Sequence, residues 1–193
     1  MRVFVAITGA SGAIYAARLL ERLLATGAEV LLSISPMGRD LLKRESGIEI
    51  DLTNFDGEAL VKGGVSLTYY HYQDLWAPPA SGSALVEAMA IVPCSMGRLG
   101  RMAAGTATDL IDRAADVCLK EGRKLVLVPR ETPLSLIHLH NMERLAEAGA
   151  TILPACPAFY HRPQSIEALV DTVVERILFH LGVPDGGIKR WSP

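Results

Sequence analysis

The strongest constraint on the fold is a pattern that recurs along the chain: a short apolar run, a small polar turn, and then a helical periodicity. Apolar runs at residues 2–8, 28–35, 88–94 and 124–129 follow this pattern. Continuous apolar runs of this length are typical of strands buried on both faces of a parallel sheet. Strands that alternate with helices predict one doubly wound α/β domain over residues 1–193.

Composition narrows the class of protein. The chain has 193 residues, of which 50% are hydrophobic, and a net charge of -2, so neither a nucleic-acid partner nor a membrane is expected. The first apolar run is too short to span a membrane and leads into a glycine turn, which predicts a strand rather than a signal peptide. Cys94, Cys118 and Cys156 form an odd set without metal-ligand spacing, which indicates a reducing, cytoplasmic location.

Small polar turns follow three of the predicted strands. The turn Gly9–Gly12 contains Ser11, Ser35 ends the second run, and Ser95–Gly97 follows the third. Parallel strands end at one edge of a sheet, and the helix N-termini that follow them favour an anion, so these turns predict a phosphate or flavin site. A merely tight strand–helix connection remains an alternative for the glycine turn. Ser35 also fits the N-cap of the next helix, and both roles are compatible.

The fourth strand ends in two opposite charges, Arg130 and Glu131. At the carboxyl edge of a sheet, an arginine is suited to hold an anion and an adjacent glutamate to donate or accept a proton. The pair therefore predicts an anion clamp beside an acid–base group. A salt-bridged start of the next helix explains the same residues and stays open.

A predicted amphipathic helix over residues 109–121 carries Arg113 and Lys120 seven positions apart, on one helix face. From this spacing alone, a solvated charged face is slightly favoured over a binding role. His138 and His140 lack the spacing of a helical metal pair, so no metal site is predicted.

The C-terminal third adds three candidate residues. Tyr160 offers a hydroxyl in a proline-bounded turn at 157–163, Arg176 lies in a predicted helix at 166–181, and Trp191 lies in the tail. A terminal tryptophan in a chain with 6% aromatic residues suggests that it docks on a ligand or a partner, or anchors to its own subunit.

Five sequence blocks resemble the flavin prenyltransferases of the UbiX type, and together they cover nearly the whole length. They include Thr8-Gly-Ala-Ser-Gly-Ala-Ile-Tyr15, Pro93-Cys-Ser-Met-Gly97, and residues 113–120. The most specific are Val128-Pro-Arg-Glu-Thr-Pro-Leu134 and Pro157-Ala-Phe-Tyr-His-Arg-Pro-Gln164.

The resemblance implies a three-layer, Rossmann-like or flavodoxin-like fold and a homo-oligomer, a dodecamer built from trimers. It implies that the protein joins a dimethylallyl group from dimethylallyl phosphate to reduced FMN. The product, prenylated FMN, would serve a separate UbiD-type decarboxylase, and the transfer would need no metal. Whether the donor is the monophosphate or the pyrophosphate stays open.

The resemblance also assigns roles to residues. It implies FMN contacts for Gly9, Ala10, Ser11, Ser35, Ser95, Met96, Gly97 and Arg130. Arg98 stands where the family usually has threonine, so it is expected either to swing outward or to add charge near the flavin.

For the allyl donor, the resemblance implies that Tyr160 and Arg176 hold the phosphate. Arg113, Lys120 and Glu131 would surround it, partly from neighbouring subunits, and this reverses the preference for a solvated face at Arg113 and Lys120. Trp191 would face the prenyl group. The catalytic set is then Glu131, Ser11, Lys120, Arg113 and Trp191, in which the cations stabilise the leaving phosphate and Glu131 and Ser11 move protons.

Two other functions fit part of the pattern. One is an FMN-dependent decarboxylase that acts on a cysteine substrate and shares the subunit fold, although the charges in the 128–134 and 157–164 blocks suit a prenyl phosphate better. The other is a non-catalytic flavin carrier.

Overall fold

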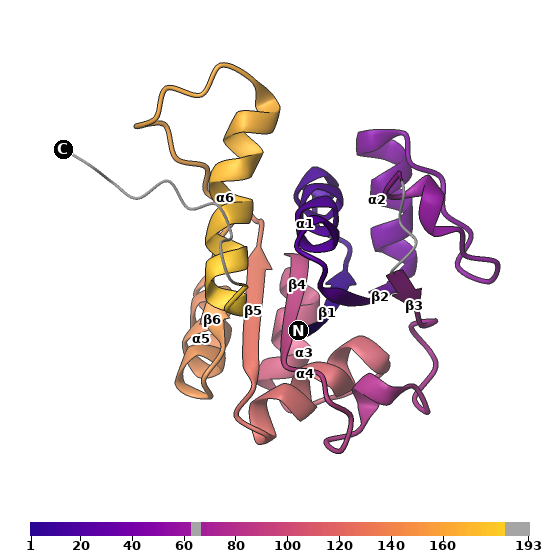
Figure 1. The fold of residues 1–193 in the computed structure, drawn as a ribbon. Coiled ribbons are helices and arrows are strands. Elements are labelled where there is room, and N and C mark those ends of the chain that lie inside the picture. Colours follow the sequence, from indigo (N-terminus) through magenta and orange to yellow (C-terminus); the bar gives the residue numbers. More distant parts are fainter. Residues whose placement is uncertain (63–66, 184–193) are drawn as a thin grey trace.

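Six parallel strands form the centre of the subunit in the computed structural model, which describes residues 1–62 and 67–183. Their order across the sheet is β3-β2-β1-β4-β5-β6 (Figure 1). The strands are β1 Arg2–Ile7, β2 Glu29–Ile34, β3 Leu67–Tyr69, β4 Ala88–Cys94, β5 Lys124–Pro129 and β6 Thr151–Ile152. This order is that of doubly wound nucleotide-binding folds, in which the chain changes direction across the sheet next to the first strand. The predicted fold class is therefore confirmed.

Helices cover both faces of the sheet. The α-helices are α1 Ala13–Ala25, α2 Pro36–Ser46, α3 Met96–Ala103, α4 Leu110–Lys120, α5 Leu136–Glu147 and α6 Ile166–Leu181, with short 3-10 helices at η1 Gly57–Ala59 and η2 Pro78–Ala80. Figure 1 shows α1 between α6 and α2. Val3 and Val5 of β1 pack into the core on the α1 and α6 side, whereas Phe4 and Ala6 pack with α3 and α4 on the other. All four side chains are fully buried, as the apolar run predicts.

Serine and aspartate side chains start most of the helices. In each case the side-chain oxygen accepts a hydrogen bond from the backbone N–H three residues later, which satisfies one of the free amides of the first turn. The N-caps with this bond are Ser35, Ser95, Asp109, Ser135 and Ser165. The N-cap predicted at Ser35 is therefore confirmed, and these caps explain why the helices begin where they do.

The segment before β4 is held against α4. Arg113 donates through Nε to the carbonyl of Ala80 at 3.2 Å, and Arg123 donates to the carbonyls of Ala84 at 2.9 Å and of Gly82. The two arginines thus bind three alternate carbonyls of this proline- and serine-rich stretch.

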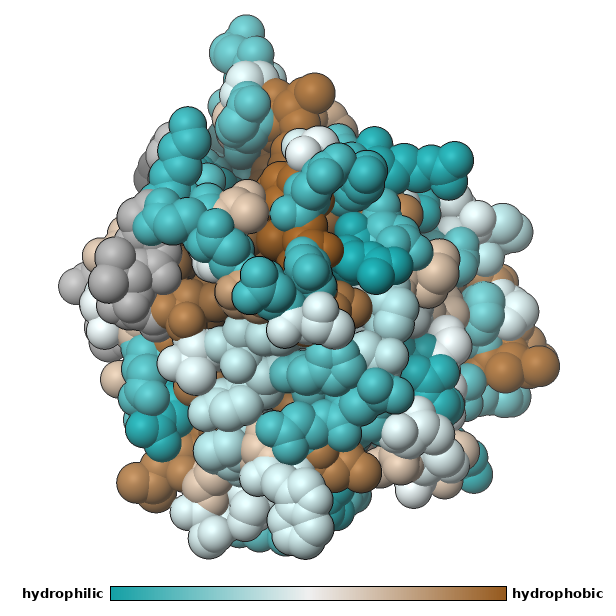
Figure 2. All heavy atoms as spheres, turned by 90° about the vertical axis from the view of Figure 1, so that its right-hand side faces the viewer, coloured by the Kyte–Doolittle hydropathy of each residue, from teal (hydrophilic) through white to brown (hydrophobic). Residues whose placement is uncertain are grey.

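On the side of the subunit that carries α2 and β3, the surface is mostly hydrophilic, with separate apolar patches (Figure 2).

Arg98 corrects one expectation from the sequence. Its side chain neither swings outward nor lies among the polar turns, because it is 5% exposed between α3 and α4. There its guanidinium lies 2.5 Å from Oδ1 of Asp109 and 2.7 Å from Oδ1 of Asp112. Asp112 also accepts from Arg101 and from the backbone and hydroxyl of Thr108. The network fixes α3 on α4. The Arg98 side chain is therefore engaged in packing these helices and is not a flavin contact.

None of the helices in the described part of the chain is long and apolar enough to cross a membrane. Cys94 and Cys118 are buried thiols, and Cys156 is exposed.

Replacing Arg98 by methionine is expected to lower the free energy of unfolding by about 3 kcal/mol, because Asp112 would keep a buried charge with fewer partners. Urea unfolding of both proteins at equal protein concentration measures the change. Arg39→Met is the matched control, since the Arg39–Asp40 pair is exposed and worth at most about 1 kcal/mol. Equal stability losses in the two variants would contradict a special role for the buried network.

Candidate functional site

The candidate site lies at the carboxyl edge of the sheet, where β1 and β4 end side by side. Thr8 links the two strands there: its hydroxyl donates to the carbonyl of Pro93 at 2.8 Å and accepts from the amide of Ser95 at 3.0 Å. Thr8 is 1% exposed, so this link is part of the interior. Crevices at such a switch point are the usual ligand sites of open parallel sheets. The polar turns after β1 and β4 therefore flank one position.

The glycine turn after β1 requires glycine at two places. Gly12 adopts φ 118°, a left-handed conformation that other residues rarely take. A Cβ atom on Gly9 would lie 2.5 Å from Cβ of Met37, so the turn and the start of α2 approach too closely for a side chain. The turn is thus tight, and Ser11 lies partly exposed on it.

The anion expected at the start of α1 comes from the chain itself. One carboxylate oxygen of Glu45, in the last turn of α2, accepts from the amides of Gly12 at 2.8 Å and Ala13 at 2.9 Å. Sequence reasoning missed this residue. A signal was present, because an acidic side chain in the last turn of a helix opposes the helix dipole and needs a compensating partner elsewhere.

The surroundings of Glu45 favour its charged form. Burial alone would raise the pKa of the carboxyl. Hydrogen bonds from the amide of Gly12, the hydroxyl of Ser11 and the amide of Ala13 act in the opposite direction, as does the positive charge of Arg130. The net effect lowers the pKa of the Glu45 carboxyl, so a fixed negative charge lies beside Ser11 and Arg130.

The starts of α2 and α3 complete a polar rim. Ser35 and Ser95 cap these helices at 3.1 Å and 3.3 Å, which still leaves each hydroxyl proton free to donate. Among the described residues, no atom beyond the chain neighbours of Gly97 and the backbone of its own helix lies within 4 Å of the position that its Cβ would take. The first turn of α3 therefore faces open space beside Met96, as a planar cofactor that approaches the backbone would require. These residues fit FMN.

Arg130 closes the rim from β5. Its Nε donates to the backbone carbonyl of Ser11 at 3.1 Å, which joins the end of β5 to the glycine turn. Glu131 is exposed, and its carboxylate accepts from the amide of Thr132 at 3.0 Å. Arg130 and Glu131, which both lie in the described part of the chain, form no ion pair with each other. The interpretation as a salt-bridged helix start therefore loses its main support.

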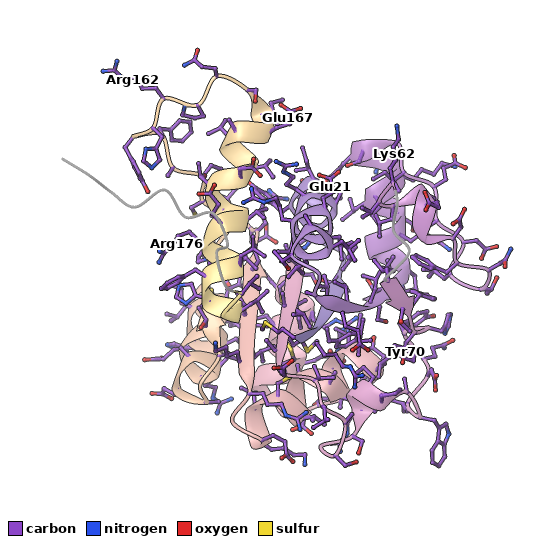
Figure 3. The ribbon with its side chains drawn as sticks, viewed as in Figure 1. Glu21, Lys62, Tyr70, Arg162, Glu167 and Arg176 are labelled. Carbon is purple, nitrogen blue, oxygen red and sulfur yellow. The ribbon has the colours of Figure 1, made fainter. Side chains whose placement is uncertain are left out.

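Tyr160 and Arg176 lie on the α6 side of the subunit. Tyr160 is 69% exposed in the turn at 157–163, which is tied to α6 by a 3.0 Å hydrogen bond from the amide of Ala158 to the hydroxyl of Thr172. Figure 3 shows Arg176 projecting from α6 away from the sheet. Both side chains are exposed, so each has room to meet a ligand.

Lys120 lies away from this edge within one subunit, and Arg113 lies one turn into the helix that leads to it. Lys120 ends α4 just before β5 begins at Lys124, which places it at the amino edge of the sheet. There its ammonium pairs with Glu121 at 2.7 Å, while Arg113 pairs with Asp116 at 2.6 Å. Within one subunit, Lys120 therefore lies at the opposite end of the strands from the glycine turn. The predicted role of Trp191 falls on a residue outside the described part of the chain.

Comparison with known proteins identifies the family. The family model described as flavoprotein matches residues 1–178. The flavin prenyltransferase UbiX of Pseudomonas aeruginosa is 47% identical over 99% of this chain and 94% of its own length, and that of Methanocaldococcus jannaschii is 42% identical over 100% and 99%. The chain belongs to the flavin prenyltransferase family. The resemblance found in the sequence blocks is thereby confirmed.

Solved structures agree with the family. AnUbiX (PadA1), crystallised in complex with FMN and dimethylallyl pyrophosphate, matches 100% of this flavin prenyltransferase chain with a TM-score of 0.90 and 41% identity, over 97% of its own chain. A dodecameric FMN-dependent UbiX-like decarboxylase from Escherichia coli also gives a TM-score of 0.90, at 38% identity over 100% of both chains. The cysteine decarboxylase TvaF has 12% identity and a TM-score of 0.60, so it shares the fold alone.

Replacing Glu45 by glutamine is expected to lower the free energy of unfolding at pH 7 by about 1 kcal/mol, the worth of a helix-start cap with its charge. The pKa of Glu45 is lowered in the folded state, so the stability it adds is complete above the ordinary carboxyl pKa and is lost as the pH falls through the folded value. Urea unfolding at several pH values measures the difference, which should shrink below about pH 4. A difference that grows on acidification would contradict this prediction.

The matched control is Glu147→Gln, which replaces an exposed glutamate at the end of α5. It should change stability little at any of these pH values.

Proposed function

We propose that this chain transfers a dimethylallyl group from dimethylallyl phosphate to reduced FMN and releases prenylated FMN. The observation that carries the proposal is the rim at the switch point, formed by Ser11, Ser35, Ser95 and Arg130 around the open first turn of α3. When bound, the reduced flavin supplies the nucleophile that accepts the allyl group. The protein must then bind the flavin, remove phosphate from the donor and exclude water.

Flavin binding is assigned to the rim. The backbone at Gly97 permits close approach, and Ser35 and Ser95 offer hydroxyl donors. The family resemblance adds contacts from Gly9, Ala10 and Ser11, and the Ser11 hydroxyl, which already donates to Glu45, would act as an acceptor. Arg130 adds a positive charge next to the glycine turn. Glu45 already occupies the amides at the start of α1, so the phosphate of FMN would bind to other donors of the rim. A planar ligand beside Met96 would cover the first turn of α3.

Phosphate departure is assigned to the exposed cations. An allylic phosphate ionises readily when its leaving group is stabilised, and arginine and lysine do this electrostatically in a site that excludes water. Arg176 and the Tyr160 hydroxyl would bind the phosphate from the α6 side, with Lys120 and Arg113 opposite them. We propose that Trp191 shields the allyl cation, a contact worth about 2 kcal/mol when desolvated.

Proton transfer is assigned to carboxylates near the rim. Glu131 is exposed and bonded only locally, so it is free to donate to or accept from a ligand. Ser11 donates to Glu45, which forms a second acid–base pair at the glycine turn. The fixed negative charge of Glu45 would also stabilise positive charge that develops on a bound ligand.

Completion of the site requires a second copy of the chain. Lys120 lies at the amino edge of its own subunit, and Arg113 is engaged with Ala80 and Asp116, so we propose that a neighbouring subunit presents both to a phosphate at the carboxyl edge. Exposed apolar side chains support close assembly: Leu136, Ile137, Phe159, Ile166 and Phe179 are all more than half exposed. We propose a dodecamer, as described for the UbiX-like structure from Escherichia coli.

The product would serve a UbiD-type decarboxylase as its cofactor. A reducing, cytoplasmic location fits the free thiols of Cys94, Cys118 and Cys156.

Anaerobic incubation with reduced FMN and dimethylallyl monophosphate tests the activity. The expected result is a flavin whose mass increases by one prenyl unit, detected by mass spectrometry. Recovery of unmodified FMN from correctly assembled protein, with either the monophosphate or the pyrophosphate donor, would contradict the proposal and favour a flavin carrier or an oxidative decarboxylase.

Replacing Arg176 by alanine should raise the KM for dimethylallyl monophosphate by roughly 10- to 100-fold, because a charged hydrogen bond to phosphate is worth about 1.5–3 kcal/mol. The Kd for FMN should change little, since Arg176 lies on α6 and away from the rim. Steady-state kinetics and flavin titration measure the two constants. Equal losses for both ligands would indicate a folding defect instead.

A further inference from the structure

The last two turns of α6 carry a small cluster around Arg176 that the proposed reaction has not used. The guanidinium carbon of Arg176 lies 5.4 Å from the centre of the Phe179 ring, and Nη2 lies 3.4 Å from Nε2 of His180. The rings of Phe179 and His180 meet edge to face at 5.3 Å. Arg176 is thus held by two neighbours, three and four residues further along the same helix face.

A hydrogen bond across the 3.4 Å contact between Arg176 and His180 is compatible with only one state of the imidazole. Arginine has donors only, so Nε2 of His180 must be the acceptor and must carry no proton. A neutral imidazole protonated at Nδ1 meets this requirement, whereas an imidazolium has no acceptor and repels the guanidinium. The position of Arg176 therefore depends on the proton state of His180.

We propose that His180 is a positioning residue that holds the Arg176 guanidinium ready for the phosphate of the allyl donor. This inference rests on the proposed role of Arg176 in phosphate binding. A long arginine side chain on a surface helix samples many rotamers, and their loss opposes ligand binding. A neutral His180 with the Phe179 face removes part of this cost before the donor arrives.

The electrostatic surroundings keep His180 neutral. Partial burial and the positive charge of Arg176 both lower the pKa of the imidazole below its ordinary value. His180 is therefore neutral at pH 7.5 and becomes protonated only on acidification. Protonation removes the acceptor and releases Arg176, so binding of the donor should weaken at low pH.

Other charged groups on the elements packed against α6 contact other residues. On α1, Arg18 and Arg22 face Asp171 near the start of α6. On β5, the Lys124 ammonium lies next to Gly182 beyond the helix end. The thiol of Cys94 on β4 packs in the core on the other face of the sheet. Among the described residues, Arg176 is the charge that acts on the imidazole.

The test compares wild type, His180→Gln and His180→Ala in steady-state assays with reduced FMN and dimethylallyl monophosphate from pH 7.5 to 5.5. Glutamine keeps a neutral acceptor that does not titrate. At pH 7.5, His180→Ala should raise KM roughly fivefold with little change in kcat, the worth of one ordinary hydrogen bond, while His180→Gln stays near wild type. As the pH falls, the wild-type KM should rise progressively relative to that of His180→Gln, toward the loss seen in His180→Ala.

Taking the ratio of the two proteins removes the titration of the donor phosphate, whose second pKa is about 6, because that titration is common to both. Parallel pH profiles for wild type and His180→Gln would overturn the inference, as would an unchanged KM in His180→Ala. Arg176→Ala is measured alongside. If it leaves KM unchanged, the phosphate role of Arg176 fails and the inference fails with it. If it raises KM while the His180 variants behave as wild type, only the positioning role fails.

Discussion

Every helix that follows a parallel strand begins with backbone amides that need an acceptor, and at the carboxyl edge of this sheet three such starts converge. The chain satisfies them from within: the Glu45 carboxylate takes the amides of α1, and Ser35 and Ser95 cap α2 and α3. The caps leave hydroxyl donors and open backbone around the switch point, while the Thr8 link holds β1 and β4 together beneath them. The rim proposed to bind the flavin is thus a consequence of how the fold satisfies its own helix ends.

The same topology underlies the proposal that one subunit holds only part of the site. The strands of a parallel sheet all have their carboxyl ends on one side and their amino ends on the other. Helix α4 runs back toward the amino ends before β5, so Lys120 lies at the opposite end of the strands from Ser11. Its ammonium is paired with Glu121 there, on the side that Arg113 and Arg123 stabilise through carbonyls of residues 80–84. Assembly offers the simplest way to bring this cationic edge to the rim of another copy. Shared sites of this kind make oligomerisation a requirement for chemistry rather than only for stability.

Local patterns in the sequence predicted the elements well, because burial of β1 or β4 is visible in single apolar runs and the start of α2 in Ser35. The strand predicted at 88–94 and the helix predicted at 166–181 coincide with β4 and α6. Pairings between distant elements could not be predicted in this way. The contact of Glu45 with Gly12 joins positions 33 residues apart, and Arg98 finds its carboxylates only because α3 and α4 pack together. The resemblance to a family predicted most of the residues of the proposed rim. It carried no information on how Arg98 is used in this chain.

The division of the site between copies is tested most directly by mixed oligomers. Lys120→Ala and Tyr160→Phe copies are each expected to assemble into oligomers with little prenyl transfer. Co-expressed, they should regain activity, because about one quarter of the sites in a random mixture combine an intact Tyr160 from one copy with an intact Lys120 from its neighbour. Mixed oligomers that are no more active than either parent would show that both residues must come from one chain, which would contradict a site shared between subunits.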